Sequence, residues 1–423
     1  MARGLRLSLL FMASLIAVYF FVNFEKALLI SVFNELQTEF GIAAGAVAGV
    51  SSVFTLAYAA MQPVTGVLVD RYGGVRVLRI GVLFFAAGSL LFPLSRSPET
   101  LYLARALTGI GAGTAYLGIV KEIDRLFPGA FTKVLGVTML TGYVGTGFAG
   151  LPVVWAVRRF GWRSVAGAFG VFIAAAALVM LRLSRGIEKP PVKAAGRWFS
   201  LQPYLRALRN RELRRMLGAS PPMYAAFFVM LNALAVKMLE DVGGFSSRSA
   251  GAVFSVMVGL SAAVPLVPGL LENLLGGRRK GLFLIQLVTA WSGLALAAAG
   301  VLFGGNAALL VSGLWMLAAA GGGTPLTVGI FRGISGPGDL GVALCLSNCT
   351  VHLLTSLFAQ ASGMLLEFFG RGGIVRAETA VIYPPGAYLA VLTLLLAAVS
   401  FALWNGCRVP ETGGRDIRRE RRD

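Results

Sequence analysis

The sequence predicts an all-α membrane protein with about twelve transmembrane helices, arranged as two halves of six. Three observations predict this class: an apolar composition, long uncharged segments and a motif that occurs in both halves. Apolar residues make up 57% of the 423 residues and charged residues only 13%, whereas soluble domains are about a quarter charged. The mean hydropathy is +0.76. A water-soluble fold cannot bury so much apolar surface, so the composition alone indicates a membrane protein.

The apolar segments are long enough to cross a bilayer. About 20 residues of helix span ~30 Å of hydrocarbon, and turn and charge signals separate the segments. The first segment carries Glu25 and Lys26 and has no small-residue cleavage pattern, so we interpret it as a span and not as a removable signal. The predicted spans are residues 7–34, 44–68, 77–95, 99–121, 132–157, 163–184, 214–239, 249–271, 281–303, 307–331, 340–368 and 386–406.

The charge distribution predicts how the chain is oriented. The formal net charge is +19, and 28 of the 38 lysine and arginine residues lie in the terminal segments and in alternate loops. Basic residues of short loops remain in the cytoplasm, so both termini are expected there, with the protein in the inner (plasma) membrane. The basicity thus orients the chain and needs no nucleic-acid partner, while the arginine-rich C-terminus is expected at anionic headgroups of the lipid bilayer.

The longest predicted cytoplasmic connection divides the chain. We expect an N-terminal half of six spans at 1–184, a linker at 185–213, a C-terminal half at 214–407 and a basic tail at 408–423. Within the linker, residues 201–217 fit an amphipathic helix on the membrane surface. Both halves carry a related motif after their second span. Its first copy is Gly66, Asp70, Arg71, Gly73, Gly74 and Arg76, and at an offset of 203 positions Gly269, Gly276, Gly277 and Arg279 recur.

The first copy resembles the signature between the second and third helices of the major facilitator superfamily, Gly-x-x-x-Asp-Arg-x-Gly-Gly-x-Arg. The sequence around Arg105 and Gly109 resembles a second signature of this family, on the fourth helix. The resemblance implies two six-helix bundles related by a pseudo-two-fold axis along the membrane normal, with a solute site between them. It also implies that the first copy is a gate. In the second copy Asn273 and Leu274 replace the acid and the arginine, so a symmetric pair of charged latches is not expected.

The first copy can also be interpreted from its residues. Asp70 falls at the predicted cytoplasmic end of a helix, where it can pair with Arg76 or with the N-terminus of a neighbouring helix. Gly73 and Gly74 allow a tight turn and a close helix approach. Such a contact can latch one bundle to the other and break in each cycle. The alternative is a plain connecting turn with exposed charges.

Ionisable groups inside spans are costly, so they mark the candidate solute site. Tyr19, Asn23 and Lys26 share one stripe of the first helix, with Glu25 on an adjacent face. Lys26 is a candidate for holding the negative group of a solute. Glu25 either pairs with Lys26 or loads a proton during transport. In the alternative interpretation both side chains reach the outer headgroups.

Three further residues are candidates. Arg105 and Tyr116 share a stripe of the fourth span, and Arg105 is expected either to bind the solute or to snorkel to the interface. The sole histidine, His352, is a candidate proton relay because imidazole titrates near neutrality. It shares a helix face with Cys345 and Cys349, but no fourth ligand is evident, so neither a metal nor another cofactor is expected.

These features favour a secondary transporter that works by alternating access, coupled to protons or to solute exchange. The mid-membrane cations, Lys26 and Arg105, belong to the first half alone, which favours a small organic anion such as a carboxylate or a phosphate ester. The chain is expected to act as a monomer. The alternative function is export of hydrophobic compounds. A channel does not account for the repeat, and a membrane enzyme would need a catalytic set that the sequence lacks.

Overall fold

The computed structural model describes residues 2–42, 44–187, 201–267, 278–335, 339–370, 375–377 and 380–412. The chain forms two compact units. Unit 1 comprises Met1–Tyr204 and Pro337–Cys345, and unit 2 comprises Leu205–Gly336 and Leu346–Asp423. Each half of the sequence therefore builds its own core, and one short segment of the second half belongs to the first unit.

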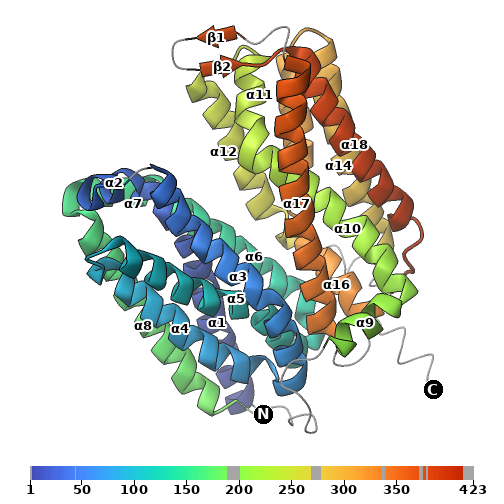
Figure 1. Cartoon of the computed structure of the whole chain (residues 1–423). Helices are drawn as coiled ribbons and strands as arrows, with labels where there is room; N and C mark the ends of the chain where they lie inside the picture. Colours follow the sequence, from blue (N-terminus) through green and yellow to red (C-terminus); the bar gives the residue numbers. More distant parts are fainter. Residues whose placement is uncertain are drawn as a thin grey trace. The chain divides into compact units, whose positions relative to one another are not determined.

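Unit 1 is a helical bundle, drawn in blue to green in Figure 1. Its long helices are α1 (Ala2–Ser31), α3 (Ala44–Tyr72), α4 (Gly74–Leu94), α5 (Pro98–Leu126), α6 (Phe131–Phe148) and α8 (Trp162–Arg185). Short elements connect them, namely α2 (Phe33–Phe40), the 3₁₀ turn η1 (Pro128–Ala130) and α7 (Leu151–Phe160). The first six residues of α17 also pack with this unit.

Unit 2 follows the same plan. Its helices are α10 (Arg211–Val229), α11 (Ala235–Asp241), α12 (Ser247–Ala263), α14 (Lys280–Leu302), α15 (Ala307–Gly321), α16 (Thr324–Ile334), α17 (Leu340–Gly370) and α18 (Pro385–Gly406). A π-helical turn, η2 (Met230–Leu234), joins α10 to α11, and α9 (Gln202–Arg209) precedes α10 in the linker. The expected surface helix at 201–217 is thus two helices, because Asn210 caps α10 by accepting from the backbone N–H of Glu212.

The twelve predicted spans each fall on one of these helices or on a broken pair. Within the described residues, nine helices are long and apolar enough to cross a membrane, and α6 with α7 makes a tenth. The other two predicted spans fall on α10 with α11 and on α12. The expected fold of twelve transmembrane helices is therefore confirmed. The sequence did not predict the antiparallel hairpin of β1 (Val375–Ala377) and β2 (Ala380–Ile382), in which Val375 pairs with Ile382.

Glycine and proline break two of the predicted spans. The predicted segment 132–157 begins as α6, breaks at Gly150 and continues as α7, which is bent by 40° from α6 and carries Pro152 in its first turn. The segment 307–331 is interrupted after Gly321, and Pro325 lies in the first turn of α16. Proline lacks the N–H that would continue a helix, so the chain bends where a proline follows a glycine.

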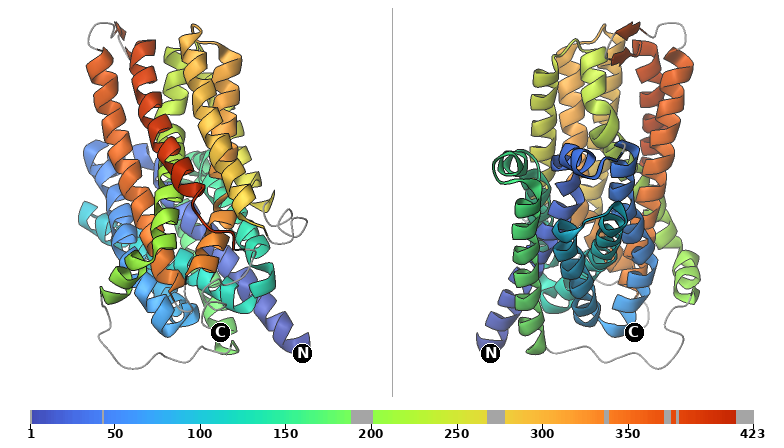
Figure 2. Two further views of the ribbon diagram at one scale, coloured as in Figure 1. Left: turned by 90° about the vertical axis from the view of Figure 1, so that its right-hand side faces the viewer. Right: turned by 60° about the vertical axis from the view of Figure 1, so that its left-hand side comes forward.

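Equivalent helix pairs pack together in each unit. In unit 1, α5 packs against α3 and α4, while α8 packs against α4 and α1; in unit 2, α15 packs against α12 and α14, while α18 packs against α14 and α10. Both views in Figure 2 show α14 and α15 side by side. Glycine permits these close approaches, since a Cβ on Gly111 would lie 2.3 Å from the backbone nitrogen of Phe85, and one on Gly313 would lie 2.5 Å from the carbonyl oxygen of Gly293. The two six-helix bundles are thus pseudo-symmetric.

Asp241 organises one end of unit 2. Its carboxylate accepts hydrogen bonds from Lys237 Nζ, from the backbone N–H of Tyr383 at 3.0 Å and from the Tyr388 hydroxyl at 2.7 Å. The carboxylate therefore joins α11 to the segment between the hairpin and α18. Figure 1 shows α11 beside β2. Lys237 thus pairs with a carboxylate whose side chain is only 2% exposed.

Glu411 closes the opposite end of unit 2. Its carboxylate accepts from the backbone N–H groups of Arg279 and Lys280, both at 3.0 Å, and so caps the N-terminus of α14. The motif arginine Arg279 is buried and donates to the carbonyl oxygen of Gly329 at 2.9 Å. The remainder of the second motif copy, with the predicted Asn273, lies outside the described residues.

Candidate functional site

A buried ion pair joins α1 to α5 within unit 1. Arg105 Nη1 donates to Glu25 Oε2 at 2.9 Å, and Nη2 donates to the backbone carbonyl of Glu25 at 3.1 Å. Both residues are almost inaccessible, at 1% and 3% exposure. The guanidinium carbon lies 4.5 Å from the ring centroid of Phe54 and 5.9 Å from that of Phe92. Aromatic faces stabilise a cation that has left water. The apolar surroundings also strengthen the electrostatic attraction between Arg105 and Glu25.

This pair differs from the pairing considered for Glu25. The sequence placed Lys26 next to Glu25 and offered it as the partner, but consecutive helical residues point to different faces. Arg105 comes from 80 positions further along the chain and reaches the same carboxylate. Arg105 therefore approaches Glu25 rather than the membrane interface, which was its alternative destination.

Lys26 lies on the other face of α1 and is exposed. Its ammonium group lies 4.1 Å above the ring of Tyr58 on α3. Within the part of the chain that the structure describes, no carboxylate forms an ion pair with Lys26. The side chain thus presents a positive charge held by an aromatic face, an arrangement that suits an incoming anion.

The other residues of the predicted stripe lie along α1. The Tyr19 hydroxyl is 3.7 Å from the sulfur of Met139, and the Asn23 amide donates to the carbonyl of Tyr19 at 2.9 Å. Both side chains lie against Gly142 of α6, where an added Cβ would come within 2.6 Å of the Tyr19 ring and 2.9 Å of the Asn23 amide nitrogen. Tyr19 and Asn23 are partly buried and link α1 to α6 beside Lys26.

The remaining two predicted residues lie on α5 and α17. Tyr116 is partly buried on α5, three turns beyond Arg105. His352 is exposed on the part of α17 that belongs to unit 2. Cys345 is buried and Cys349 is partly buried on the same helix, and no group of metal-ligating side chains occurs within the described ranges.

Asp70 makes a second set of contacts, at the opposite end of unit 1. One carboxylate oxygen accepts from the backbone N–H of Gly341 at 3.1 Å and from Lys121 Nζ at 2.7 Å, and the other accepts from the backbone N–H of Val342 at 3.0 Å. These N–H groups open α17, where the helix dipole favours a negative charge. We call these contacts the Asp70 latch.

Glycines give the Asp70 latch its close packing. A Cβ on Gly66 would lie 2.8 Å from Cβ of Cys345 and 3.1 Å from the carbonyl oxygen of Gly341. Gly73 has φ +83°, a conformation that other residues adopt at a cost. A Cβ on Gly74 would lie 2.5 Å from the carbonyl oxygen of Gly118 on α5. These three motif glycines therefore serve a turn and two helix contacts.

The motif arginines lie beside the Asp70 latch. Arg71 packs with its guanidinium carbon 5.2 Å from the ring centroid of Tyr72. Arg76 donates to the carbonyl oxygen of Tyr72 at 3.2 Å. Lys121 therefore supplies the side-chain cation that contacts Asp70, the part for which the sequence offered Arg76.

Sequence reasoning missed the contribution of α5 to this end. Lys121 pairs with Asp70, and the side chain of the next residue, Glu122, is fully buried. Its carboxylate accepts from the backbone N–H of Val75 at 3.0 Å and from Arg125 at 2.5 Å, so it caps the start of α4. A signal was available, because glycine at Gly74 leaves room for such an acid next to a helix N-terminus.

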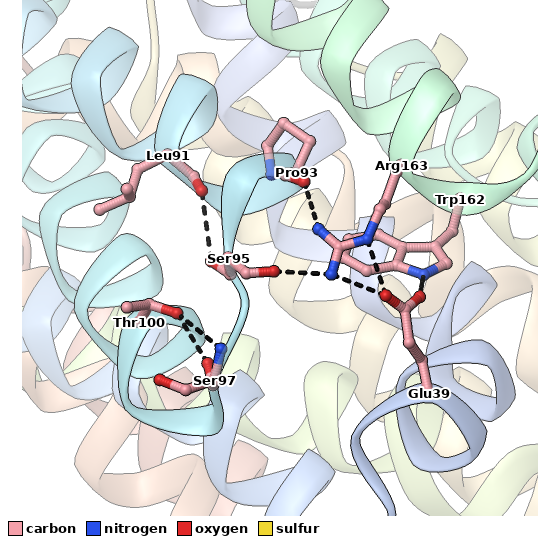
Figure 3. A network of polar contacts seen from close by, with 8 residues as sticks. All are labelled: Glu39, Leu91, Pro93, Ser95, Ser97, Thr100, Trp162 and Arg163. Atoms are coloured by element: carbon pink, nitrogen blue, oxygen red, sulfur yellow. Dashed lines mark hydrogen bonds and ion pairs between the residues drawn. The ribbon is translucent and has the colours of Figure 1, made fainter.

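The other end of unit 1 is held by Glu39 (Figure 3). Its carboxylate accepts from Trp162 Nε1 at 2.5 Å and from Arg163 Nε at 2.8 Å. Arg163 also donates to the carbonyls of Pro93 and Ser95, at 2.5 and 2.6 Å, which close the end of α4. Burial raises the pKa of Glu39, but the two donors and the arginine charge outweigh it, so this pKa lies below its usual value.

Two pseudo-symmetric bundles of apolar helices, with charges buried inside the spans, are typical of a multi-pass solute carrier of the membrane. The chain belongs to the Major Facilitator Superfamily, whose family model matches residues 15–292. The resemblance of the two sequence signatures is thereby confirmed.

Curated relatives include carriers of aromatic acids. The chain is 27% identical to the 3-(3-hydroxy-phenyl)propionate transporter of Escherichia coli (strain K12), over 77% of this chain and 86% of that protein. It is 28% identical to the gallate transporter of Pseudomonas putida, over 36% of this chain and about a third of that protein (34%). It is also 24% identical to the multidrug resistance protein Stp of Mycobacterium tuberculosis, over 89% of this chain and 74% of that protein.

Among solved structures, the fold is similar to that of the fucose:proton symporter of E. coli. The TM-score is 0.69, with 14% sequence identity over 93% of this chain and 98% of the symporter. At this identity the similarity concerns the fold.

Proposed function

We propose that this chain is a secondary active transporter of a small organic anion, most specifically an aromatic carboxylate. The observation that carries the proposal is Lys26, a cation inside a transmembrane helix that is exposed and lies over the ring of Tyr58. An exposed ammonium held over an aromatic ring offers a carboxylate a charge partner. Two relatives, the gallate transporter and the 3-(3-hydroxy-phenyl)propionate transporter, support this substrate class.

The Glu25–Arg105 pair provides a route for proton coupling. When a proton neutralises the Glu25 carboxylate, the buried Arg105 loses its counter-ion, and an uncompensated buried charge is costly. Binding of an anionic solute near Lys26 then restores the charge balance of unit 1. The proton and the anion therefore favour each other, which is the thermodynamic requirement for symport.

The remaining parts follow from the same scheme. The Asp70 latch acts as the gate, since it holds the first turn of α17 against α3 in one state and releases it in the other. Both termini lie in the cytoplasm because the basic residues concentrate in that set of loops. The protein acts as a monomer in the inner (plasma) membrane, and His352 remains a second candidate for carrying a proton.

Uptake into proteoliposomes tests the proposal. Purified protein is reconstituted, and uptake of labelled gallate, 4-hydroxybenzoate and 3-(3-hydroxyphenyl)propionate is measured with and without an inward proton gradient. We expect the gradient to raise accumulation of at least one acid. Lys26→Ala should reduce its uptake about tenfold or more, since a charge-assisted contact contributes ~1.5–3 kcal/mol, whereas Lys26→Arg should retain part of it.

Lys133→Ala is the matched control, because Lys133 is an exposed lysine on α6 outside the cluster. It should transport at the native rate. Normal uptake by a folded Lys26→Ala protein would contradict the assignment of Lys26, and lack of any gradient effect would contradict proton coupling.

Export of hydrophobic compounds is the second candidate function. It is favoured by the similarity to the multidrug resistance protein, which extends over 89% of this chain. Inverted membrane vesicles that accumulate a lipophilic dye, with no uptake of the three acids in proteoliposomes, would replace the anion proposal with this one.

A further inference from the structure

A cavity of about 310 Å³ lies in unit 1 between α3 and α4. These helices follow each other in the chain but contact each other little, because α5 packs extensively against both. The space between α3 and α4 is therefore a groove with α5 as its floor. The residues around it include Met61, Leu68, Ile80, Phe84, Ile110 and Thr114.

The groove has apolar walls and opens on an exposed apolar face. Ile80 is 62% exposed and Phe84 is 41% exposed, as expected for side chains of a membrane span that face hydrocarbon. The hydroxyl of Thr114 is occupied, since it donates to the carbonyl of Gly111 at 2.8 Å. A hydrophilic solute would find no partner on these walls, whereas an acyl chain would fill the space and recover the contacts that an empty cavity lacks.

The polar end of the groove is formed by Tyr72 and Arg76. Arg76 is the motif arginine that does not hold Asp70, and its one described hydrogen bond goes to the carbonyl oxygen of Tyr72. Its stem lines the groove, and its guanidinium keeps further N–H donors that suit a phosphate. Arg71 brings a second positive charge to the ring of Tyr72.

We propose that this groove is a binding site for an anionic phospholipid, with one acyl chain between α3 and α4 and the phosphate on Arg76. The charge complementarity carries the choice of ligand, because the arginines lie at the end of the bundle that the proposed orientation places in the cytoplasmic leaflet, where anionic lipids give a negative surface. The proposal depends on that orientation and not on the transported solute.

Native mass spectrometry of the delipidated full-length protein tests the site. Phosphatidylglycerol is titrated in, with phosphatidylcholine as the zwitterionic comparison. We expect tighter binding of phosphatidylglycerol and about fivefold weaker binding after Arg76→Gln, the effect of one basic residue at an anionic surface. Arg182→Gln is the matched control, because Arg182 is exposed at the same end of unit 1 on α8, and it should change the affinity less than twofold.

A second pair of variants tests the acyl-chain part. Ile80→Trp fills the groove, while Leu83→Trp adds the same ring at a position of α4 that is 56% exposed and does not line it. We expect Ile80→Trp to reduce phosphatidylglycerol binding at least fivefold and Leu83→Trp to leave it unchanged. Equal binding of the two lipids, or equal effects within either pair of variants, would overturn the site. Both tryptophan positions are exposed, so this pair of variants still tests the lipid site if Arg76→Gln does not fold. A negative result for lipid binding would not contradict the proposed anion transport, because anion uptake is measured separately.

Discussion

At the residue scale, the Glu25–Arg105 pair determines how much substitutions at these two positions destabilise unit 1. Each partner alone would be a buried charge without compensation, since both side chains are no more than 4% exposed. We therefore expect Glu25→Leu or Arg105→Met each to destabilise the protein by about 3–5 kcal/mol. The double variant should recover most of this loss, because it leaves an apolar site of similar volume. The melting temperature of the purified protein in detergent measures both effects.

The comparison of single and double variants separates two roles for these residues. If the double variant is as unstable as the two single losses combined, the pair contributes no coupling and the interpretation of its burial is incorrect. If it is stable but has lost gradient-driven uptake, the pair serves transport and is dispensable for folding. Lys26→Ala is the control for stability, because Lys26 is exposed and should melt like the native protein.

Sequence reasoning located these residues but not their contacts. Glu25, Lys26 and Arg105 stand out because charges are rare within spans. Their pairing depends on how α1 and α5 are rotated about their axes. The sequence of a helix determines which residues share a face, but it does not determine which other helix packs against that face. The motif was more informative: Asp70 was expected at a helix N-terminus or with Arg76, and the structure places it at the start of α17 with Lys121.

At the element scale, Glu39 joins three helices of unit 1 at one end (Figure 3). Its folded-state pKa lies below the ordinary value, so the stabilisation is present above the unfolded pKa of about 4.3 and is lost as the pH falls through the folded value. We expect the melting temperature to fall below about pH 4 and expect Glu39→Gln to reduce this acid dependence. The effect should be small, because Glu39 and Arg163 are 41% and 36% exposed.

Glu35→Gln is the control for this pH measurement, since Glu35 lies one turn before Glu39 on α2 and is not part of the network drawn in Figure 3. An acid dependence that persists unchanged in Glu39→Gln would show that other carboxylates are responsible. High salt should weaken the native dependence, because exposed ion pairs are screened.

The elements themselves were largely predictable. Apolar length determined the spans, whereas the breaks beside Gly150, Pro152 and Pro325 are findings of the structure. The hairpin β1–β2 was not predictable from hydropathy because it consists of two strands of three residues outside any span. The cap that Glu411 gives α14 was also hidden, because the acid lies more than 130 positions from the N–H groups it accepts.

At the scale of the whole molecule, the internal packing repeats, but the charged contacts of the described residues differ between the two units. The same helix pairs pack in both units, whereas the ends of corresponding helices are capped differently: α4 by Glu122 on α5 and α14 by Glu411 beyond α18. Helix packing follows from small and apolar residues that both halves share. The caps can differ because many acids near a helix N-terminus satisfy the same N–H groups. We therefore expect transport to depend on the charges that are particular to one half, above all Lys26, Arg105 and Asp70.

The Asp70 latch leads to a prediction about the transport cycle. Asp70→Asn keeps the shape of the side chain but removes the charge that faces the start of α17 and Lys121. The loss should favour the open state about tenfold, or ~1.4 kcal/mol, within the range for a charge at a helix terminus. Cys345 reports this change, because it is 1% exposed and lies against Gly66. In a Cys349→Ser and Cys407→Ser background, its rate of labelling by a small thiol reagent should rise about tenfold after Asp70→Asn.

Asp124→Asn is the control, because Asp124 lies at the same end of α5, and it should leave the labelling rate unchanged. Equal labelling rates in the two variants would refute the gate, because the charge of Asp70 would then contribute nothing to the closed state.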